Sequence, residues 1–267
     1  MGLESLGVCE ILVLSGEVHP QSPRRRQWFN LIYQICELAL ELGFLPHTNA
    51  GPLSFDEMKQ LKLVNVSMGL MLEQMTSQLL QTVHQKAPSK EPYLRLQQLH
   101  QAGVLGIPFT TGLLLGIGES SQDWSETLEA IARSHERWGH IQEVILQPYQ
   151  PGTLEATPGT TIGFADLIQA ITLAKERLPL DIALQVPPNL ISSQSALRAC
   201  IEAGVTDLGG IVPLDHVNPD YTHQDVSNLS QQLAHWGYDL CQRLPVYKHQ
   251  EAKVPNRLIP YLGAWKR

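Results

Sequence analysis

The sequence predicts an α/β fold, namely a partial or open (β/α) TIM-type barrel of about seven parallel strands. Two observations predict this fold. Short apolar runs with strand character alternate with longer runs that have apolar residues at helical spacing, and this alternation is typical of parallel strands joined by helices. The strand candidates are too many for a small open sheet and too few for a closed barrel.

The individual elements follow from apolar patterning and from the residues that end each run. Strands are predicted at 8–14, 44–47, 63–72, 109–115, 141–146, 181–186 and 208–212. Helices are predicted at 29–42, 95–102, 122–138, 164–177, 195–202 and 226–241. Gly43 follows the first helix as a stop signal. The segment from Ser54 to Glu57 has the form of a capping box, so a further short helix is expected to begin there.

Bulk composition narrows the class of protein. The chain has 267 residues, of which 43% are hydrophobic and 17% charged, which indicates one globular domain over residues 1–267. The net charge of -7 and the pI of about 5.8 argue against a nucleic-acid-binding protein. No apolar run reaches the ~18 residues that suggest a membrane span, and no signal peptide is recognised. We therefore expect a cytoplasmic protein with no membrane or nucleic-acid partner.

The cysteines do not form a metal-binding pattern. The four are Cys9, Cys36, Cys200 and Cys241. No two of them have the spacing of metal ligands, and their number suits a reducing compartment. Cys36 and Cys200 fall within helical patterns, where packed thiols are expected.

The first predicted strand comes early in the chain, after only seven residues. A barrel that starts so abruptly is expected to lack its opening βα unit. A short barrel that is complete in itself is the alternative.

A polar side chain stands at the end of every predicted strand. In chain order the ends carry Ser15-Gly16-Glu17, His47-Thr48-Asn49, Glu73, Glu119, Gln147, Gln185 with Asn189 nearby, and Asp215-His216. In barrels the carboxyl ends of the strands meet on one face, where the chemistry takes place. We therefore expect a shared polar pocket, although any one of these residues taken alone is also compatible with a turn or a helix cap.

The composition of this pocket indicates the kind of ligand. It is rich in amides and carboxylates and poor in cations, which suits a molecule with many hydroxyl, amine and ring-nitrogen groups. Gly112 and Gly116 would let a flat ring approach the strand backbone closely. No glycine-rich phosphate loop opens a helix, so a phosphate ligand is not indicated.

Two motifs resemble those of radical S-adenosylmethionine (SAM) enzymes. The pattern Gly-x-Leu-x-Gly-x-x-Glu from Gly112 to Glu119 is similar to the strand that contacts adenine in that superfamily. The turn at Ser15, Gly16 and Glu17 resembles the Gly-Gly-Glu turn that holds the methionine amino group, with serine for the first glycine. Longer segments resemble the CofG-type subunit of 7,8-didemethyl-8-hydroxy-5-deazariboflavin (FO) synthase, at 43–51, 65–73, 107–112, 139–147, 185–189 and 207–210. This resemblance runs from about residue 7 to residue 219.

The resemblance implies a reaction and its cofactors. A [4Fe-4S] cluster would reduce SAM to methionine and a 5′-deoxyadenosyl radical. The radical would abstract hydrogen from 5-amino-5-(4-hydroxybenzyl)-6-(D-ribitylimino)-5,6-dihydrouracil. Ring closure with loss of ammonia would then give FO, in the biosynthesis of coenzyme F420. A CofH-type second subunit would supply the substrate.

The resemblance also implies roles for individual residues. Gly16 and Glu17 would hold the methionine end of SAM, and Glu73 would bind its ribose hydroxyls. The adenine would be lined by Gly112, Gly116 and Glu119. The uracil and ribityl groups of the substrate would be bound by Gln147, Gln185, Asn189 and Asn218. The sequence assigns no catalytic acid or base and no metal ligand.

One departure from the family bears on activity. The family holds its cluster with a Cys-x-x-x-Cys-x-x-Cys loop after the first barrel strand, and such clusters require thiolate ligands. That loop would lie upstream of Gly7, and the chain does not contain it. The chain alone is therefore expected not to make a radical. We favour a working enzyme shortened at its N-terminus over a protein that has lost the activity.

Two other interpretations remain open from the sequence. In a metal-dependent barrel hydrolase or aldolase, His47, Asp215 and His216 would be ligands or bases. The spacing gives no support, because the chain has neither His-x-His nor Glu-x-x-His. In the other interpretation the barrel is not an enzyme and serves as a clusterless binding partner of the second subunit.

Overall fold

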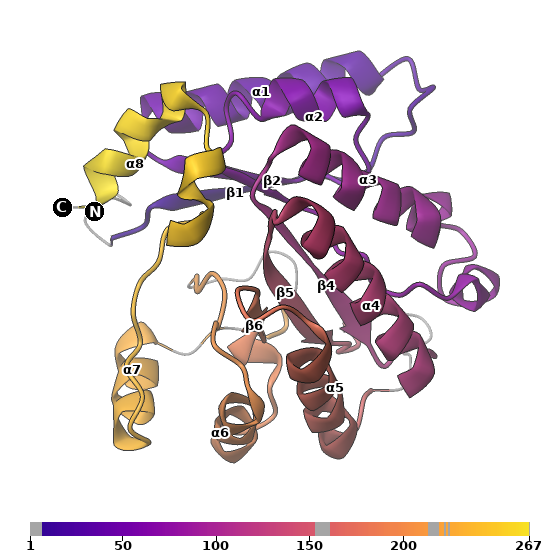
Figure 1. Cartoon of the computed structure of the whole chain (residues 1–267), viewed down its shortest axis with the longest axis vertical. Helices are drawn as coiled ribbons and strands as arrows, with labels where there is room; N and C mark the ends of the chain where they lie inside the picture. Colours follow the sequence, from indigo (N-terminus) through magenta and orange to yellow (C-terminus); the bar gives the residue numbers. More distant parts are fainter. Residues whose placement is uncertain (1–6, 153–160, 213–218, 222, 224, 267) are drawn as a thin grey trace.

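The strands form one parallel sheet that does not close. The computed structural model describes residues 7–152, 161–212, 219–221, 223 and 225–266. Within these residues the strands are β1 (Glu10–Leu14), β2 (Leu45–Asn49), β3 (Ser67–Gly69), β4 (Phe109–Leu115), β5 (Ile141–Pro148) and β6 (Ala183–Gln185). They lie in the order β1-β2-β3-β4-β5-β6, and β6 does not return to β1 (Figure 1). The predicted open, partial barrel is confirmed.

Helices connect successive strands and cover the outer face of the curved sheet (Figure 1). They are α1 (Arg25–Glu41), α2 (Phe55–Leu61), α3 (Pro92–Leu105), α4 (Ser121–Trp138) and α5 (Phe164–Arg177). After the last strand come α6 (Gln194–Ala203), α7 (Val226–His235) and α8 (Ile259–Trp265). Short 3₁₀ helices are η2 (Ser77–Gln81), η3 (Pro88–Lys90), η4 (Pro188–Leu190), η5 (Lys248–Lys253) and η6 (Asn256–Leu258). Parallel neighbours require such crossover connections.

The apolar core lies between the sheet and its helices. Strand side chains alternate between the two faces of a sheet. On the helix side Leu113 and Val144 are fully buried and belong to one core cluster with Leu128 of α4. On the other face, toward the barrel interior, Thr110 and Glu143 meet through a hydrogen bond of 3.1 Å. The interior of the barrel is therefore partly polar, while its wall is held by apolar contacts.

Local signals in the sequence place several helix ends correctly. The predicted capping box is present, since the Ser54 hydroxyl accepts from the Glu57 N–H at 3.2 Å and the Glu57 carboxylate accepts from the Ser54 N–H at 2.8 Å. Arg25 of α1 also donates to Glu57, at 2.7 Å. Gly43, with a φ of 87°, follows α1 as predicted, and Gly139, with a φ of 59°, ends α4.

Several predicted elements are wrong in their extent. The strand predicted over 63–72 is only 67–69, and the helix predicted over 95–102 runs from 92 to 105. The run 208–212 forms no strand, and a single bridge joins Gln185 to Asp207. The Asp207 carboxylate accepts from the Gly209 N–H at 2.6 Å, and Gly209 has a φ of 72°, so the chain turns where a seventh strand would continue. The helix predicted over 226–241 ends at His235, because Gly237 has a φ of 85° and reverses the chain.

The open side of the barrel leaves apolar groups exposed. β1 has a neighbour on one side only among the described residues, and its Leu12 and Leu14 are 50% and 43% exposed. The α1 stripe, which we define as the exposed apolar side chains of that helix, consists of Leu31, Ile35, Leu38 and Leu42. Since α1 contacts β1, the free edge and the stripe form a surface that a further strand–helix unit can cover.

A substitution at Gly103 would test how closely α3 and α4 pack. Replacing glycine by alanine in an exposed helix stabilises it by ~1 kcal/mol. A methyl group at Gly103, however, would lie 2.5 Å from the Trp138 ring. We therefore expect Gly103→Ala to lower the free energy of unfolding by about 1–3 kcal/mol in urea denaturation. The exposed Gln97→Ala in the same helix should be neutral. A Gly103→Ala protein as stable as wild type would contradict this packing.

Candidate active site

Polar side chains gather at both ends of the strands. The rim cluster, which we define as Glu17, Glu73, His84, Lys90 and Arg95, lies beyond the carboxyl ends of β1 and β3. The base network, which we define as His47, Ser67, Glu143, Asp207, Arg243 and Tyr247, joins the amino-terminal part of the sheet to the C-terminal segment. Because barrels carry out chemistry at the carboxyl ends of their strands, the rim cluster is the candidate active site.

Arg95 is the centre of the rim cluster. It lies on the inner face of α3, and its side chain is only 3% exposed. Its Nη2 donates to Glu17 Oε1 at 3.0 Å and its Nη1 donates to the Met71 carbonyl oxygen at 2.5 Å. Its Nε donates to the Ser89 carbonyl oxygen at 3.0 Å. One guanidinium group thus fixes the loops that follow β1 and β3 relative to each other.

Glu73 has an unusual backbone conformation. Its φ of 66° makes it the single non-glycine residue with a positive φ among those described. Its N–H donates to the Gly112 carbonyl oxygen of β4 at 2.9 Å. A left-handed conformation costs a side-chain-bearing residue on the order of 1 kcal/mol, and it persists where the surroundings fix it. The position of this carboxylate is therefore set by its contacts.

Basic side chains surround the Glu73 carboxylate. His84 Nε2 lies 3.0 Å from Oε2, Arg95 Nη1 lies 3.6 Å from Oε1, and Lys90 forms an ion pair with Oε1. Burial alone would raise the pKa of Glu73, but the adjacent His84 ring and the charges of Lys90 and Arg95 lower it to about 2. Glu73 is therefore ionised at neutral pH, as it must be to bind a ligand or to orient a charged neighbour.

The turn after β1 has the form that a ligand site requires. Glu17 is one-third exposed while it accepts from Arg95. A Cβ atom at Gly51 would lie 2.4 Å from the Glu17 side chain, so the glycine makes room for that carboxylate. No atom lies within 4 Å of the position of a Cβ at Gly16. Gly16 and Glu17, two of the predicted residues, thus border accessible space next to Arg95.

Glu119 lies at the predicted strand end, but its carboxylate is engaged. It accepts from the backbone N–H groups of Gly116 and Ile117 at 2.7 and 2.8 Å, and from Trp124 Nε1 at 2.8 Å. These bonds fix the turn between β4 and α4. A ligand that reaches this turn would therefore meet its backbone more readily than the Glu119 side chain.

The space beside Gly112 and Gly116 is taken by the protein itself. A Cβ at Gly112 would lie 2.3 Å from the Ile145 carbonyl oxygen and 2.8 Å from Met71 Sδ. A Cβ at Gly116, whose φ is 92°, would lie 2.7 Å from the backbone nitrogen of Ile162. Both glycines thus permit close packing of the chain, and the approach of a flat ring to them stays a prediction.

The residues predicted for the substrate do not form one group. Gln147 lies at the end of β5, paired in register with Leu114. Gln185 is buried, and its amide nitrogen lies 2.7 Å from Glu143 Oε1, so it belongs with the base network. Asn189 of η4 donates to the Tyr221 carbonyl oxygen at 2.6 Å. Asn218, like the alternative ligands Asp215 and His216, lies outside the described residues.

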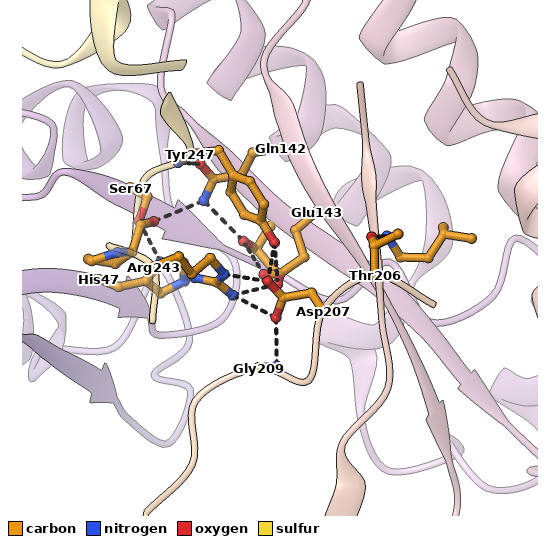
Figure 2. A network of polar contacts seen from close by, with 12 residues as sticks. His47, Ser67, Gln142, Glu143, Thr206, Asp207, Gly209, Arg243 and Tyr247 are labelled. Atoms are coloured by element: carbon orange, nitrogen blue, oxygen red, sulfur yellow. Dashed lines mark hydrogen bonds and ion pairs between the residues drawn. The ribbon is translucent and has the colours of Figure 1, made fainter. Parts of the chain in front are cut away.

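The base network is built on Arg243 (Figure 2). Its Nη2 donates to Glu143 Oε1 at 2.6 Å and its Nε donates to Asp207 Oδ2 at 2.5 Å. The Tyr247 hydroxyl lies 2.6 Å from Asp207 Oδ2 and 3.1 Å from Glu143 Oε1. These contacts attach the C-terminal segment to β5 and to the chain that follows α6. The network therefore fastens the base of the open barrel.

Burial and shared charge set the pKa values in this network. Burial raises the pKa of Glu143 well above its ordinary value, against the opposing charge of Arg243. Burial acts in the same direction on Asp207, but hydrogen bonds from Arg243 and Tyr247 hold its pKa below the ordinary range. The two carboxylates raise the pKa of Arg243 despite its burial. Arg243 therefore stays charged and compensates the acidic side chains around it.

His47 belongs to the base network. Burial, together with the charge of Arg243, lowers the pKa of His47 to about 3, so the ring is neutral at pH 7. Ser67 donates its hydroxyl hydrogen to the Pro245 carbonyl oxygen at 2.6 Å and therefore accepts from His47 Nδ1 at 2.7 Å. The described part of the chain contains no group of three or more side chains able to hold a metal ion.

Sequence reasoning missed the basic side chains of the rim cluster, and it also missed Arg243. Lys90 and His84 lie in a segment without helical or strand periodicity, where nothing marked them as site residues. Arg95 carried a usable signal, because it shares the inner face of its helix with Gln98 and Leu99. An arginine on the buried side of an amphipathic helix needs an anionic or carbonyl partner inside the protein. No comparable pattern marks Arg243.

Known relatives match nearly the whole chain. It is 60% identical over 259 residues to the 7,8-didemethyl-8-hydroxy-5-deazariboflavin synthase of Synechococcus elongatus, and the match covers 97% of this chain and 77% of the relative. The chain belongs to the 7,8-didemethyl-8-hydroxy-5-deazariboflavin (FO) synthase family. Another FO synthase, from Thermosynechococcus vestitus, is 61% identical over 245 residues, with 92% of this chain and 78% of the relative covered. No protein-family model matches the chain.

Solved structures agree with the fold of this FO synthase family member. The FeFe-hydrogenase maturase HydG of Carboxydothermus hydrogenoformans is similar with a TM-score of 0.68 at 16% identity, over 97% of this chain and 62% of HydG. Methylornithine synthase (PylB) is similar with a TM-score of 0.61 at 15% identity, over 86% of this chain and 68% of that protein. These similarities show the fold alone. Among the described helices of the chain, none has the length and apolar character needed to cross a membrane.

Loss of the Arg243 cation should destabilise the barrel. Arg243→Met leaves Glu143 and Asp207 together without their shared partner, and breaking a buried ion pair in this way costs about 3–5 kcal/mol. We expect a decrease of that size in the free energy of unfolding in urea. Arg133→Met is the control, since Arg133 is 67% exposed and should change stability by less than ~0.5 kcal/mol. A loss below ~1 kcal/mol for Arg243→Met would contradict a fastening role for the base network.

Glu73 should make stability depend on acid pH. Its pKa of about 2 in the folded state lies below the ordinary 4.5, so the ionised carboxylate stabilises the fold above pH 4.5 and this contribution is lost as the pH falls toward 2. Glu73→Gln should therefore be less stable than wild type at pH 7, on the order of 3 kcal/mol. Urea denaturation at pH 7, 5 and 3 should show the difference shrinking at the lowest pH. A difference that stays constant would exclude this linkage.

Proposed function

We propose that the chain forms the SAM-binding and substrate-binding part of a CofG-type FO synthase. The main support is that a chain 60% identical to an enzyme of that name holds a buried arginine between two carboxylates at the catalytic end of its strands. The proposed reaction closes 5-amino-5-(4-hydroxybenzyl)-6-(D-ribitylimino)-5,6-dihydrouracil to FO with loss of ammonia, in the biosynthesis of coenzyme F420.

The rim cluster suits the methionine end of SAM, which carries an ammonium and a carboxylate group. Glu17 is one-third exposed and has capacity to accept hydrogen bonds from an ammonium group beyond its bond to Arg95. The open space at Gly16 lets a ligand reach the backbone of the same turn. Once bound, SAM supplies the 5′-deoxyadenosyl group that abstracts hydrogen in this family. Glu73 is the proposed group for the ribose side, and the turn from Gly116 to Glu119 is proposed for adenine.

The cysteines of this chain do not fit a [4Fe-4S] cluster. Cys36 is fully buried and contacts Thr48 Oγ1 at 3.3 Å, and Cys200 is fully buried in α6. Burial raises the pKa of both thiols, that of Cys200 to about 11, so the thiolate form that iron requires is disfavoured. Cys9 is also buried and Cys241 is exposed. We therefore assign no cluster ligand and derive no step that passes through a cluster.

The surface beside β1 suggests where cluster ligands could be supplied. The free edge of β1, with Leu12 and Leu14 exposed, can pair with a parallel strand, and the α1 stripe can accept an amphipathic helix. We infer that a strand–loop–helix unit with the Cys-x-x-x-Cys-x-x-Cys motif would dock here. This agrees with the expected absence of an opening βα unit from the barrel.

Only part of the proposed substrate site lies among the described residues. Gln147 and Asn189 remain the proposed groups for the uracil and ribityl moieties, with Asn218 beyond the described part of the chain. Gln185 is engaged with Glu143 below them. We propose that a CofH-type second subunit delivers the substrate.

The missing thiolates favour one further candidate function, that of a non-catalytic SAM-binding partner of the second subunit. This candidate and the enzyme share the rim cluster and therefore both predict SAM binding. They differ in the effect of a supplied cluster, which would start turnover only in the enzyme.

SAM binding tests the proposal directly. Isothermal titration of the purified chain with SAM should show binding to one site, and Glu17→Gln should weaken it about tenfold, since a hydrogen bond to a charged group contributes ~1.5–3 kcal/mol. Glu129→Gln, a half-exposed glutamate on α4, is the matched control and should bind as wild type does. Absence of SAM binding by the wild-type chain would overturn the proposal.

Turnover separates the two candidate functions. Under anaerobic conditions with SAM, iron, sulfide and reductant, the chain alone should retain no cluster and form no FO from the dihydrouracil substrate. With a strand–loop–helix unit that carries the cysteine motif, FO formation should appear and should be detectable by mass spectrometry. A reconstituted cluster without FO formation would favour the non-catalytic binding partner.

A further inference from the structure

The connection between β3 and α3 returns to the rim cluster. This return loop, which we define as residues 77–91, contains η2 and η3 and precedes α3, the α-helix of the connection between β3 and β4. It places His84 and Lys90 on the Glu73 carboxylate. It also provides the Ser89 carbonyl oxygen that accepts from Arg95 Nε at 3.0 Å. The return loop thus makes three polar contacts with two residues of the site.

Lys90 and Arg95 approach the same oxygen of Glu73. Lys90 forms an ion pair with Oε1, whereas Arg95 Nη1 remains 3.6 Å from Oε1, beyond hydrogen-bond distance. Arg95 instead directs Nη1 to the Met71 carbonyl oxygen and Nη2 to Glu17 Oε1. Because Lys90 compensates the charge of Glu73, Arg95 remains available to Glu17.

The exposed fractions support this division between the two cations. Arg95 is 3% exposed and cannot exchange its protein partners for water, whereas Lys90 is 28% exposed. If the ammonium group were removed, the nearest buried cation able to compensate the Glu73 carboxylate would be Arg95. A shift of the guanidinium toward Glu73 would take Nη2 away from Glu17, which is the residue that borders the open space at Gly16.

We propose that Lys90 is a positioning residue for SAM: by pairing with Glu73 it keeps Arg95 on Glu17 and so keeps the turn after β1 in its binding geometry. Lys90 need not touch the ligand for this role. The proposal rests on the proposed function, since it concerns the same site, and it assigns to the return loop a task beyond connecting β3 to α3.

The test compares SAM affinities of four proteins by isothermal titration. Lys90→Met should raise the Kd for SAM about tenfold, and Lys90→Arg, which keeps the cation, should restore it to within about threefold of wild type. Lys86→Met is the matched control, because Lys86 is an exposed lysine of the same loop, and it should bind as wild type does. Thermal unfolding of each protein identifies any variant that fails to fold. If Lys90→Met fails to fold, Lys90→Arg is compared with wild type instead.

A double-variant cycle separates positioning from a merely structural role. Glu17→Gln should weaken SAM binding less in the Lys90→Met background than in wild type, because Glu17 has already lost its partner there. Equal effects in the two backgrounds, or a Lys90→Met protein with wild-type affinity, would overturn the positioning role and leave the proposed function intact. A wild-type chain that does not bind SAM would overturn both.

Discussion

The burial of Arg95 is the constraint on which the candidate site depends. A guanidinium group that is 3% exposed cannot be satisfied by water, so its donors must be met by the protein. Those partners come from the turn after β1, from the chain after β3 and from the return loop. No ladder of backbone hydrogen bonds joins these three segments at this point. Arg95 therefore holds them in one arrangement. Glu17 is oriented, and Glu73 can keep its left-handed backbone, because of this arrangement.

The two polar clusters have different roles at the two ends of the barrel. Arg243 compensates carboxylates at the base, where the C-terminal segment closes the sheet from below. Arg95 does so at the rim, where Glu17 remains partly open to ligands. The same chemistry, one arginine between two acids, thus stabilises the fold at one end and prepares a site at the other. The difference lies in exposure, since Glu143 is fully buried and Glu17 is not.

The fold was largely predictable from the sequence because its signals are local. The run 109–115 is the observed β4, and 164–177 is the observed α5. The prediction failed at 208–212, where the pairing of Asp207 with Arg243 from a distant part of the chain prevails over strand patterning. Gln185 is likewise buried and pairs with Glu143 of the base network, so it lies outside the expected polar pocket. Such long-range charge pairing leaves no periodic pattern in a sequence.

Only the acidic residues of the candidate site were predictable from the sequence. Glu17 and Glu73 follow strand ends, and this position marked them as candidates. Lys90 and His84 come from a loop whose path depends on the whole fold, so no spacing rule applied to them. The expected amide-rich and cation-poor pocket was therefore wrong in its charge balance, because two cationic side chains, Lys90 and Arg95, lie near Glu73.

The uncovered side of the barrel has a consequence for the behaviour of the chain in solution. A parallel strand with one row of free peptide groups, next to leucines at positions 12, 14, 31 and 38, is as suitable for a second copy as for any other segment. Self-association through this side would increase with concentration and would be relieved by mild detergent. Preparations of the isolated chain would then aggregate more readily at high concentration.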